Sequence, residues 1–84
     1  MSYQIRFTKR ADKDIKKLSP KLKAKLQEIL RKRIAVNPFS GKALLGDLKG
    51  YYSVRLSYKD RIIYSIHEEE LIVMVVRAKT HYGE

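Results

Sequence analysis

The sequence predicts an α+β fold in the order β-α-α-β-β-β, in which a helical hairpin packs on one face of a small, mostly antiparallel four-stranded sheet. Apolar residues recur at helical spacing only between residues 9 and 35, and they alternate at strand spacing before and well after that stretch. Short polar turns separate the three C-terminal strand segments, which favours an antiparallel meander. With 84 residues and no internal repeat, we expect a single domain spanning residues 1–84.

The first strand and the first helix are predicted from the N-terminal residues. Between residues 2 and 7, apolar side chains alternate with polar ones, at Tyr3, Ile5 and Phe7. Thr8 then stands where the N-cap of a helix is expected. Offsets of four and three follow between the next apolar residues, which are Ala11, Ile15 and Leu18. The pattern predicts a short strand followed by a short helix.

The second helix is predicted to begin at Ser19 and Pro20, with serine as the N-cap and proline at the first helical position. An apolar stripe at helical spacing follows, made of Leu22, Leu26, Ile29, Leu30 and Ile34. The helix should end near Ala35, because Asn37-Pro38-Phe39-Ser40-Gly41 is rich in turn-forming residues. From there to Gly50 the sequence shows no sustained period, and we expect a loop.

Three strands are expected in the second half of the chain, over residues 51–56, 61–67 and 71–78, where Val, Ile and Tyr are frequent. Period-2 alternation divides each strand into two faces. The face expected to contact the helices carries Tyr52, Val54 and Leu56, then Ile62, Tyr64 and Ile66, then Ile72, Met74 and Val76. Arg55, Arg61 and Arg77 therefore fall together on the opposite, open face.

The expected register brings these arginines side by side. If the last turn places His67 opposite Leu71, then Arg61 lies opposite Arg77, and a three-residue turn before it places Arg55 opposite Arg61. Like charges that face each other across a sheet are destabilising, so such a cluster indicates a bound anion. The alternative is that the arginines pair with carboxylates such as Asp47 or Asp60.

Composition and charge narrow the function classes. The 19 Lys and Arg against 9 Asp and Glu give a net charge of +10, and residues 1–37 hold 12 of the basic groups with only 3 acidic ones. Such a surface attracts polyanions, although a solvated helical face would show the same pattern.

With no cysteine and only two histidines, the chain offers no disulfide framework and no paired-ligand metal motif, so we expect no metal or cofactor. No apolar run is long enough for a signal peptide or a membrane span, and we expect a cytoplasmic protein.

Four residues outside the strands are further candidates. His81 and Tyr82 follow the last strand, and a histidine beside arginines that hold a phosphate can donate or accept a proton near neutral pH. Tyr82 can stack on a base or hydrogen-bond a phosphate, although it can equally pack against the sheet edge. Lys42 and Lys49 lie in the loop and can reach a phosphate or act as a base, although most loop lysines are simply solvated.

Taken in order, these segments resemble the RelE/ParE superfamily of toxins from type II toxin-antitoxin systems, and in particular its YoeB-like branch. The resemblance covers nearly the whole chain. Its most specific stretches are Asn37 to Lys42, Leu48 to Arg55, Asp60 to Tyr64, and the ending with Arg77, His81 and Tyr82.

The resemblance implies a toxin that cleaves messenger RNA in the A site of the small ribosomal subunit and is silenced by a cognate antitoxin. Arg61 matches the arginine that stabilises the scissile phosphate, and Arg55 matches an accompanying basic residue. Arg77 resembles the arginine of the final strand. His81 and Tyr82 resemble the His-Tyr ending of YoeB-like toxins, in which the histidine is a proton donor.

Two features depart from the YoeB pattern. The loop from Lys42 to Gly50 is shorter and has no glutamate at the position of the proposed general base, although Asp47 lies nearby, and Gly83 and Glu84 follow the His-Tyr pair. The interpretation is therefore an endoribonuclease without an assigned base, which inhibits translation. Two alternatives stay open: a ParE-like inhibitor of DNA gyrase, and a basic RNA-binding module without catalysis.

Overall fold

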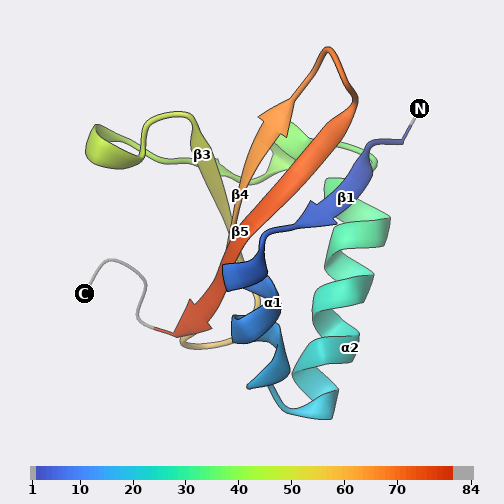
Figure 1. Cartoon of the computed structure of the whole chain (residues 1–84), viewed down its shortest axis with the longest axis vertical. Helices are drawn as coiled ribbons and strands as arrows, with labels where there is room; N and C mark the ends of the chain where they lie inside the picture. The colour runs from blue at the N-terminus through green and yellow to red at the C-terminus, as the bar shows by residue number, and fades with distance from the viewer. Residues whose placement is uncertain (1, 81–84) are drawn as a thin grey trace.

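Residues 2–80 are described by the computed structural model, in which two helices cover one face of a five-stranded sheet (Figure 1). The helices are α1 (Lys9–Lys16) and α2 (Pro20–Ile29). The strands are β1 (Gln4–Phe7), β2 (Lys42–Ala43), β3 (Tyr51–Arg55), β4 (Asp60–His67) and β5 (Ile72–Thr80), in the spatial order β1-β5-β4-β3-β2. The predicted α+β class is confirmed. The predicted count of four strands is one too low, because β2 has only two residues and carries no periodicity.

Side-chain caps set the start of each helix, as the sequence predicts. The Thr8 hydroxyl accepts a hydrogen bond from the Ala11 N–H at 3.1 Å, and the Ser19 hydroxyl accepts one from the Leu22 N–H at 3.3 Å. The helix α2 continues as a π-helical turn over Leu30–Ile34, so the helical stretch ends next to Ala35.

The core lies between the helices and the sheet. Its least exposed helical residues are Ala11, Leu26, Leu30 and Ile34, and those of the sheet are Val54, Leu56, Ile62, Tyr64, Val73, Val75 and Ala78. Burying side chains of this kind provides about 1.5–3 kcal/mol for each large one, and their continuity from α2 to β5 fixes the hairpin on the sheet.

The strand β5 turns a different face to the helices from the one predicted. Its core residues are Val73, Val75 and Ala78, instead of Ile72, Met74 and Val76. The turn before β5 has four residues, Glu68 to Leu71, so His67 pairs with Ile72 and every following side chain changes face. Leu71 closes this turn with a φ of 55°, in the left-handed region.

A β-bulge at Val76 then reverses the change. Tyr64 lies opposite Val75 and Ile63 lies opposite Arg77, so Val76 is the additional residue. Arg77 therefore returns to the predicted face. Because the two irregularities add, Arg61 lies opposite Lys79, and the prediction that Arg61 faces Arg77 is wrong by two residues.

The segment after α2 is fixed to the sheet by Tyr64, which is fully buried. Its hydroxyl donates to the Pro38 carbonyl at 2.7 Å. Burial raises the pKa of the Tyr64 phenol above its ordinary value, and the backbone N–H of Gly41 lowers it in part. A Cβ on Gly41 would collide with the Tyr64 hydroxyl and lie 2.9 Å from the Ser53 carbonyl oxygen. Glycine is therefore required where β2 begins beside β3.

In the part of the chain that the structure describes, no helix combines the length and apolar character needed to cross a membrane.

Candidate nucleic-acid site

Two arginines face each other on the side of the sheet away from the helices. Arg55 at the end of β3 pairs in register with Arg61 near the start of β4, as the sequence predicts. Arg55 is exposed and Arg61 is half-buried, and no ion pair joins either of them to another described residue. Two cations held opposite each other without a carboxylate create a local positive potential that an anion relieves.

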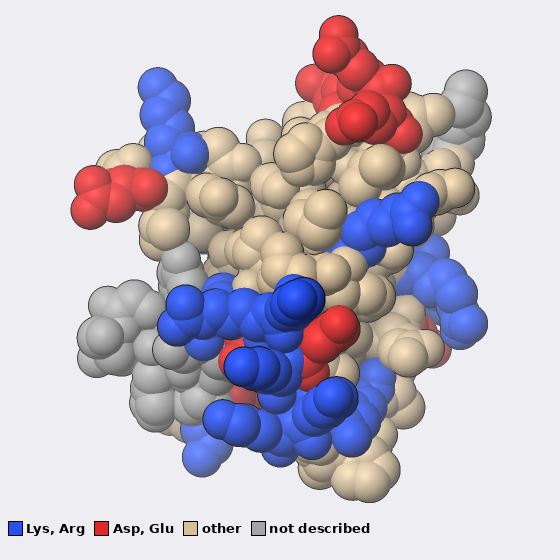
Figure 2. Space-filling model, in the orientation of Figure 1, with Lys and Arg blue, Asp and Glu red and all other residues tan. Residues whose placement is uncertain are grey.

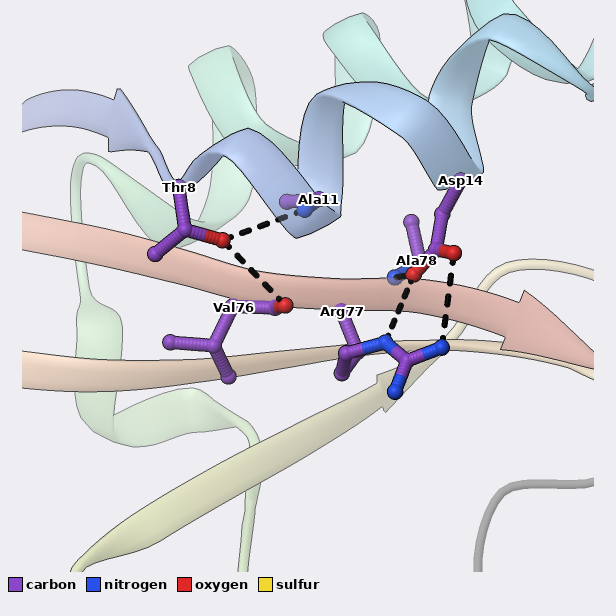
Figure 3. A network of polar contacts seen from close by, with 6 residues as sticks. All are labelled: Thr8, Ala11, Asp14, Val76, Arg77 and Ala78. Atoms are coloured by element: carbon purple, nitrogen blue, oxygen red, sulfur yellow. Dashed lines mark hydrogen bonds and ion pairs between the residues drawn. The ribbon is translucent and has the colours of Figure 1, made fainter.

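Arg77 lies on the same face by register but is held differently. Its Nε donates to Asp14 Oδ2 at 2.8 Å and its Nη2 donates to Oδ1 at 3.4 Å (Figure 3). Both side chains are largely buried, with exposed fractions of 20% for Arg77 and 13% for Asp14. The alternative considered for the arginines, pairing with a carboxylate, thus holds for Arg77, although the carboxylate is Asp14 instead of Asp47 or Asp60.

Asp14 reaches Arg77 because α1 covers the edge of β5 that β1 leaves open. The strand β1 runs parallel to β5 only as far as Phe7 opposite Val75, and the Thr8 N–H then donates to the Val75 carbonyl at 3.1 Å. Further along α1, Asp14 Oδ2 accepts the Ala78 N–H at 3.1 Å (Figure 3). The carboxylate therefore replaces a neighbouring strand for this part of β5.

Sequence reasoning missed Asp14. The sequence offers one indication of its role, which is its position in the last turn of α1. An aspartate there interacts unfavourably with the helix dipole unless it has a specific partner.

The two candidate lysines lie in different places. Lys42 on β2 pairs with Ser53, which places it on the open face, two residues along from Arg55 on the neighbouring strand. Lys49 is exposed and follows a 3-10 turn over Gly46–Leu48. The structure therefore brings Lys42 to the arginine pair by register, while Lys49 borders the loop beside it.

A hollow of about 350 Å³ opens on the same face of the sheet, at Ile63, which lies two residues from Arg61 along β4. Its lining residues are Asp47, Leu48, Tyr51, Ile63 and Val76. Ile63 is buried, with an exposed fraction of 1%, although it points away from the helices. The hollow is thus a shallow depression that combines apolar side chains with the polar groups of Asp47 and Tyr51.

His81 and Tyr82 lie outside the described residues. His67, the other histidine, is exposed on β4, where its Nε2 lies 3.1 Å from the Ser65 hydroxyl. Among the described residues, no group of three or more His, Asp or Glu side chains is placed to hold a metal ion.

Charge is distributed unevenly over the surface. Figure 2 shows basic side chains gathered over α1 and acidic side chains gathered at the tip of the β4–β5 hairpin. The acidic residues of that tip are Glu68, Glu69 and Glu70, all exposed. Positive charge is therefore concentrated at the helices and negative charge at the hairpin tip.

Comparison with known proteins places these features in a family. Residues 5–81 match the family model of the ParE toxin of the type II toxin-antitoxin system parDE. The chain is 33% identical over 78 residues to Toxin RelG from Mycobacterium tuberculosis, a match that covers 92% of this chain and 88% of that protein.

Solved structures agree with this match. The fold superposes with a TM-score of 0.87 on a chain of the toxin-antitoxin complex RelBE2 from Mycobacterium tuberculosis, at 30% identity and covering 96% of this chain and 93% of that one. It also resembles the YoeB dimer from Staphylococcus aureus, with a TM-score of 0.77, 28% identity and coverage of 98% and 100%.

Proposed function

Since the chain belongs to the RelE/ParE superfamily of toxins from type II toxin-antitoxin systems, we propose that it acts as an endoribonuclease on ribosome-bound messenger RNA. One observation carries the proposal: Arg55 and Arg61 lie opposite each other on the open face, with no ion pair to a described residue. A paired guanidinium site of this kind fits the oxygens of one phosphodiester.

The proposed reaction is an internal transfer. The 2′-hydroxyl of the RNA gives its proton to a loop group or to one of the site residues, and its oxygen attacks the adjacent phosphorus. The bond to the 5′-oxygen of the next nucleotide breaks, and a cyclic phosphate and a 5′-hydroxyl result. This step needs no metal ion, because the substrate supplies its own nucleophile. Arg61 and Arg55 stabilise the negative charge that develops on the phosphoryl oxygens. His81 protonates the leaving 5′-oxygen, and Tyr82 orients the base or the phosphate.

Arg77 takes a supporting part in this proposal. The Asp14 carboxylate accepts from two of its nitrogen atoms, and a guanidinium carries five N–H groups, so three donors stay available for an RNA oxygen. The Asp14 contact fixes the direction in which they point. Lys42 and Lys49 contact the RNA backbone on either side, and the ribosome adds to the positioning of the message.

An acidic antitoxin is the expected protein partner. The related RelBE2 structure is a complex of toxin and antitoxin. On this chain the net charge of +10 favours an acidic segment that folds as it binds and covers the basic surface.

The central test is Arg61→Ala. We expect it to abolish toxicity on induction in cells and the cleavage of ribosome-bound transcripts, mapped by primer extension, while the circular dichroism spectrum stays native. Arg6→Ala is the matched control, because Arg6 is an exposed arginine on the edge strand β1 and its loss changes the net charge equally. A folded Arg61→Ala protein with full cleavage activity contradicts the proposed phosphate site, and an unfolded one shows that Arg61 is structural.

The match to the ParE family model favours one second candidate, inhibition of DNA gyrase through protein binding alone. Induced cells separate the two functions directly. Loss of messenger RNA within minutes supports the nuclease, whereas accumulation of DNA breaks with intact transcripts supports gyrase inhibition.

A further inference from the structure

The hollow beside the arginine pair suits a small, flat ligand with apolar faces and polar edges, because its lining is polar and apolar in about equal parts. Its volume of about 350 Å³ is near the lower end of small-molecule pockets, which span about 300–1,000 Å³. Leu48, Ile63 and Val76 give it apolar walls, and Tyr51 adds a half-buried aromatic ring. These groups match the two faces of a nucleobase, because each of the four bases can stack on an aromatic ring.

Its place on the sheet matches the geometry of one nucleotide. Ile63 lies two residues from Arg61 on the same face of β4, which is about 7 Å along the strand. On β3, Ser53 separates Tyr51 from Arg55 on that face. The hollow therefore lies within reach of the sugar and base of a nucleotide whose phosphate is held by Arg55 and Arg61.

Asp47 supplies the polar group of the site. It lines the hollow and is exposed, and its carboxylate forms no hydrogen bond or ion pair with a described residue. An ionised carboxylate only accepts hydrogen bonds. Cytosine, adenine and guanine each present an exocyclic amino group that donates, whereas the pairing edge of uracil has one N–H between two carbonyl oxygens that repel a carboxylate.

We propose that this hollow binds the base next to the scissile phosphate and that Asp47 makes it select an amino-bearing base over uracil. The inference rests on the proposed function, since it assigns a specificity pocket to the same site. Tyr51 stacks on the bound base, and Asp47 reads its edge. Asp47 is then a specificity residue and takes no proton in the reaction.

The first experiment measures cleavage. The substrates are ribosome-bound messages that carry each of the four bases on either side of the cut. They are treated with wild type, with Asp47→Asn, and with Glu69→Gln at the hairpin tip. Glu69→Gln is the control, because it removes one acidic charge as Asp47→Asn does. Wild type and Glu69→Gln should disfavour uracil by about tenfold or more at one of the two positions. Asp47→Asn should lose that preference, because an amide donates to the carbonyl oxygens of uracil as well as accepting from the amino group of cytosine.

The second experiment measures binding without cleavage. Short RNAs with a 2′-deoxy nucleotide at the cut, carrying cytosine or uracil, are titrated against the same proteins by fluorescence anisotropy. Tyr51→Leu should weaken both complexes by about fivefold to a hundredfold, and Tyr51→Phe, which keeps the aromatic ring, should weaken them less than Tyr51→Leu does.

The outcomes separate the inference from the function on which it rests. Cleavage by wild type with no base preference, or an unchanged preference in Asp47→Asn, overturns the pocket and leaves the nuclease standing. An absence of cleavage by wild type, together with an Asp47-dependent preference for the cytosine RNA, overturns the nuclease and leaves the pocket. Loss of cleavage on every base in Asp47→Asn identifies Asp47 as the general base and contradicts the inference.

Discussion

Replacing Asp14 should destabilise the protein more than replacing any other aspartate of α1. Its carboxylate accepts three hydrogen bonds, from two nitrogen atoms of Arg77 and from the Ala78 N–H, and only 13% of its side chain is exposed. In Asp14→Ala the Ala78 N–H loses its acceptor in a residue that is 1% exposed. An unsatisfied buried donor costs about 1–3 kcal/mol.

The charge of Arg77 adds to that cost. Removing one partner of a fully buried ion pair costs about 3–5 kcal/mol, but Arg77 is still 20% exposed, so water replaces part of the lost contact. We therefore expect Asp14→Ala to lower the free energy of unfolding by about 2–4 kcal/mol, which corresponds to about 10–25 °C in Tm for a domain of this size. Asp14→Asn should lose about half as much, because its amide oxygen still accepts the Ala78 N–H.

The assay is urea unfolding followed by circular dichroism, on Asp14→Ala, Asp14→Asn, Arg77→Ala and the double variant. The double-mutant cycle should give a coupling of about 0.5–3 kcal/mol between the two side chains. Asp12→Ala is the control, because Asp12 is an exposed aspartate in the first turn of the same helix and should cost about 0.5 kcal/mol. A cost for Asp14→Ala no larger than that of the control, or a coupling near zero, would refute the reasoning.

Three further predictions follow from the fold and the charge. Tyr64→Phe should lower stability at neutral pH by about 1–3 kcal/mol, because the Pro38 carbonyl loses its buried donor. Since the folded-state pKa of Tyr64 is raised, its phenol contributes fully below the unfolded value of 10.0 and its contribution falls as pH rises above that value, so wild type and variant should converge in alkaline melts. Truncation after Thr80 should leave the thermal melt nearly unchanged but slow single-turnover cleavage by about 10² to 10⁴, and equal rates would remove His81 and Tyr82 from the mechanism. The complex with the antitoxin should weaken steeply with salt, measured by isothermal titration, and a complex unaffected by molar salt would contradict an acidic, charge-matched partner.

The elements that periodicity describes were predictable, and the details that depend on single residues were not. Thr8, Ser19 and Pro20 mark the helix starts locally, and the alternation in β3 and β4 assigns their faces correctly. The first residues of β5 are apolar on both faces and show no alternation. The length of the preceding turn therefore decides which side of β5 meets the helices.

In the candidate site too, some features could be predicted from the sequence and others could not. The pairing of Arg55 with Arg61 depends on one short turn, and the sequence predicted it. The contact of Arg77 with Asp14 joins residues 63 positions apart through the crossing of α1 over the edge of β5, which no local pattern encodes. The hollow was also beyond sequence reasoning, because it forms only where the Gly46–Leu48 turn folds back beside Ile63 and Val76.

The bulge at Val76 has a consequence for how this protein tolerates change. It separates β5 into two parts whose positions are set independently, the first by the Glu68–Leu71 turn and the second by the Asp14 carboxylate at Ala78. A change of one residue in the length of the turn would move Val73 and Val75 out of the core, because both lie between the turn and the bulge. The exposed tip is therefore free to diverge in composition between descendants of this chain, whereas its length is constrained by the core residues that follow it.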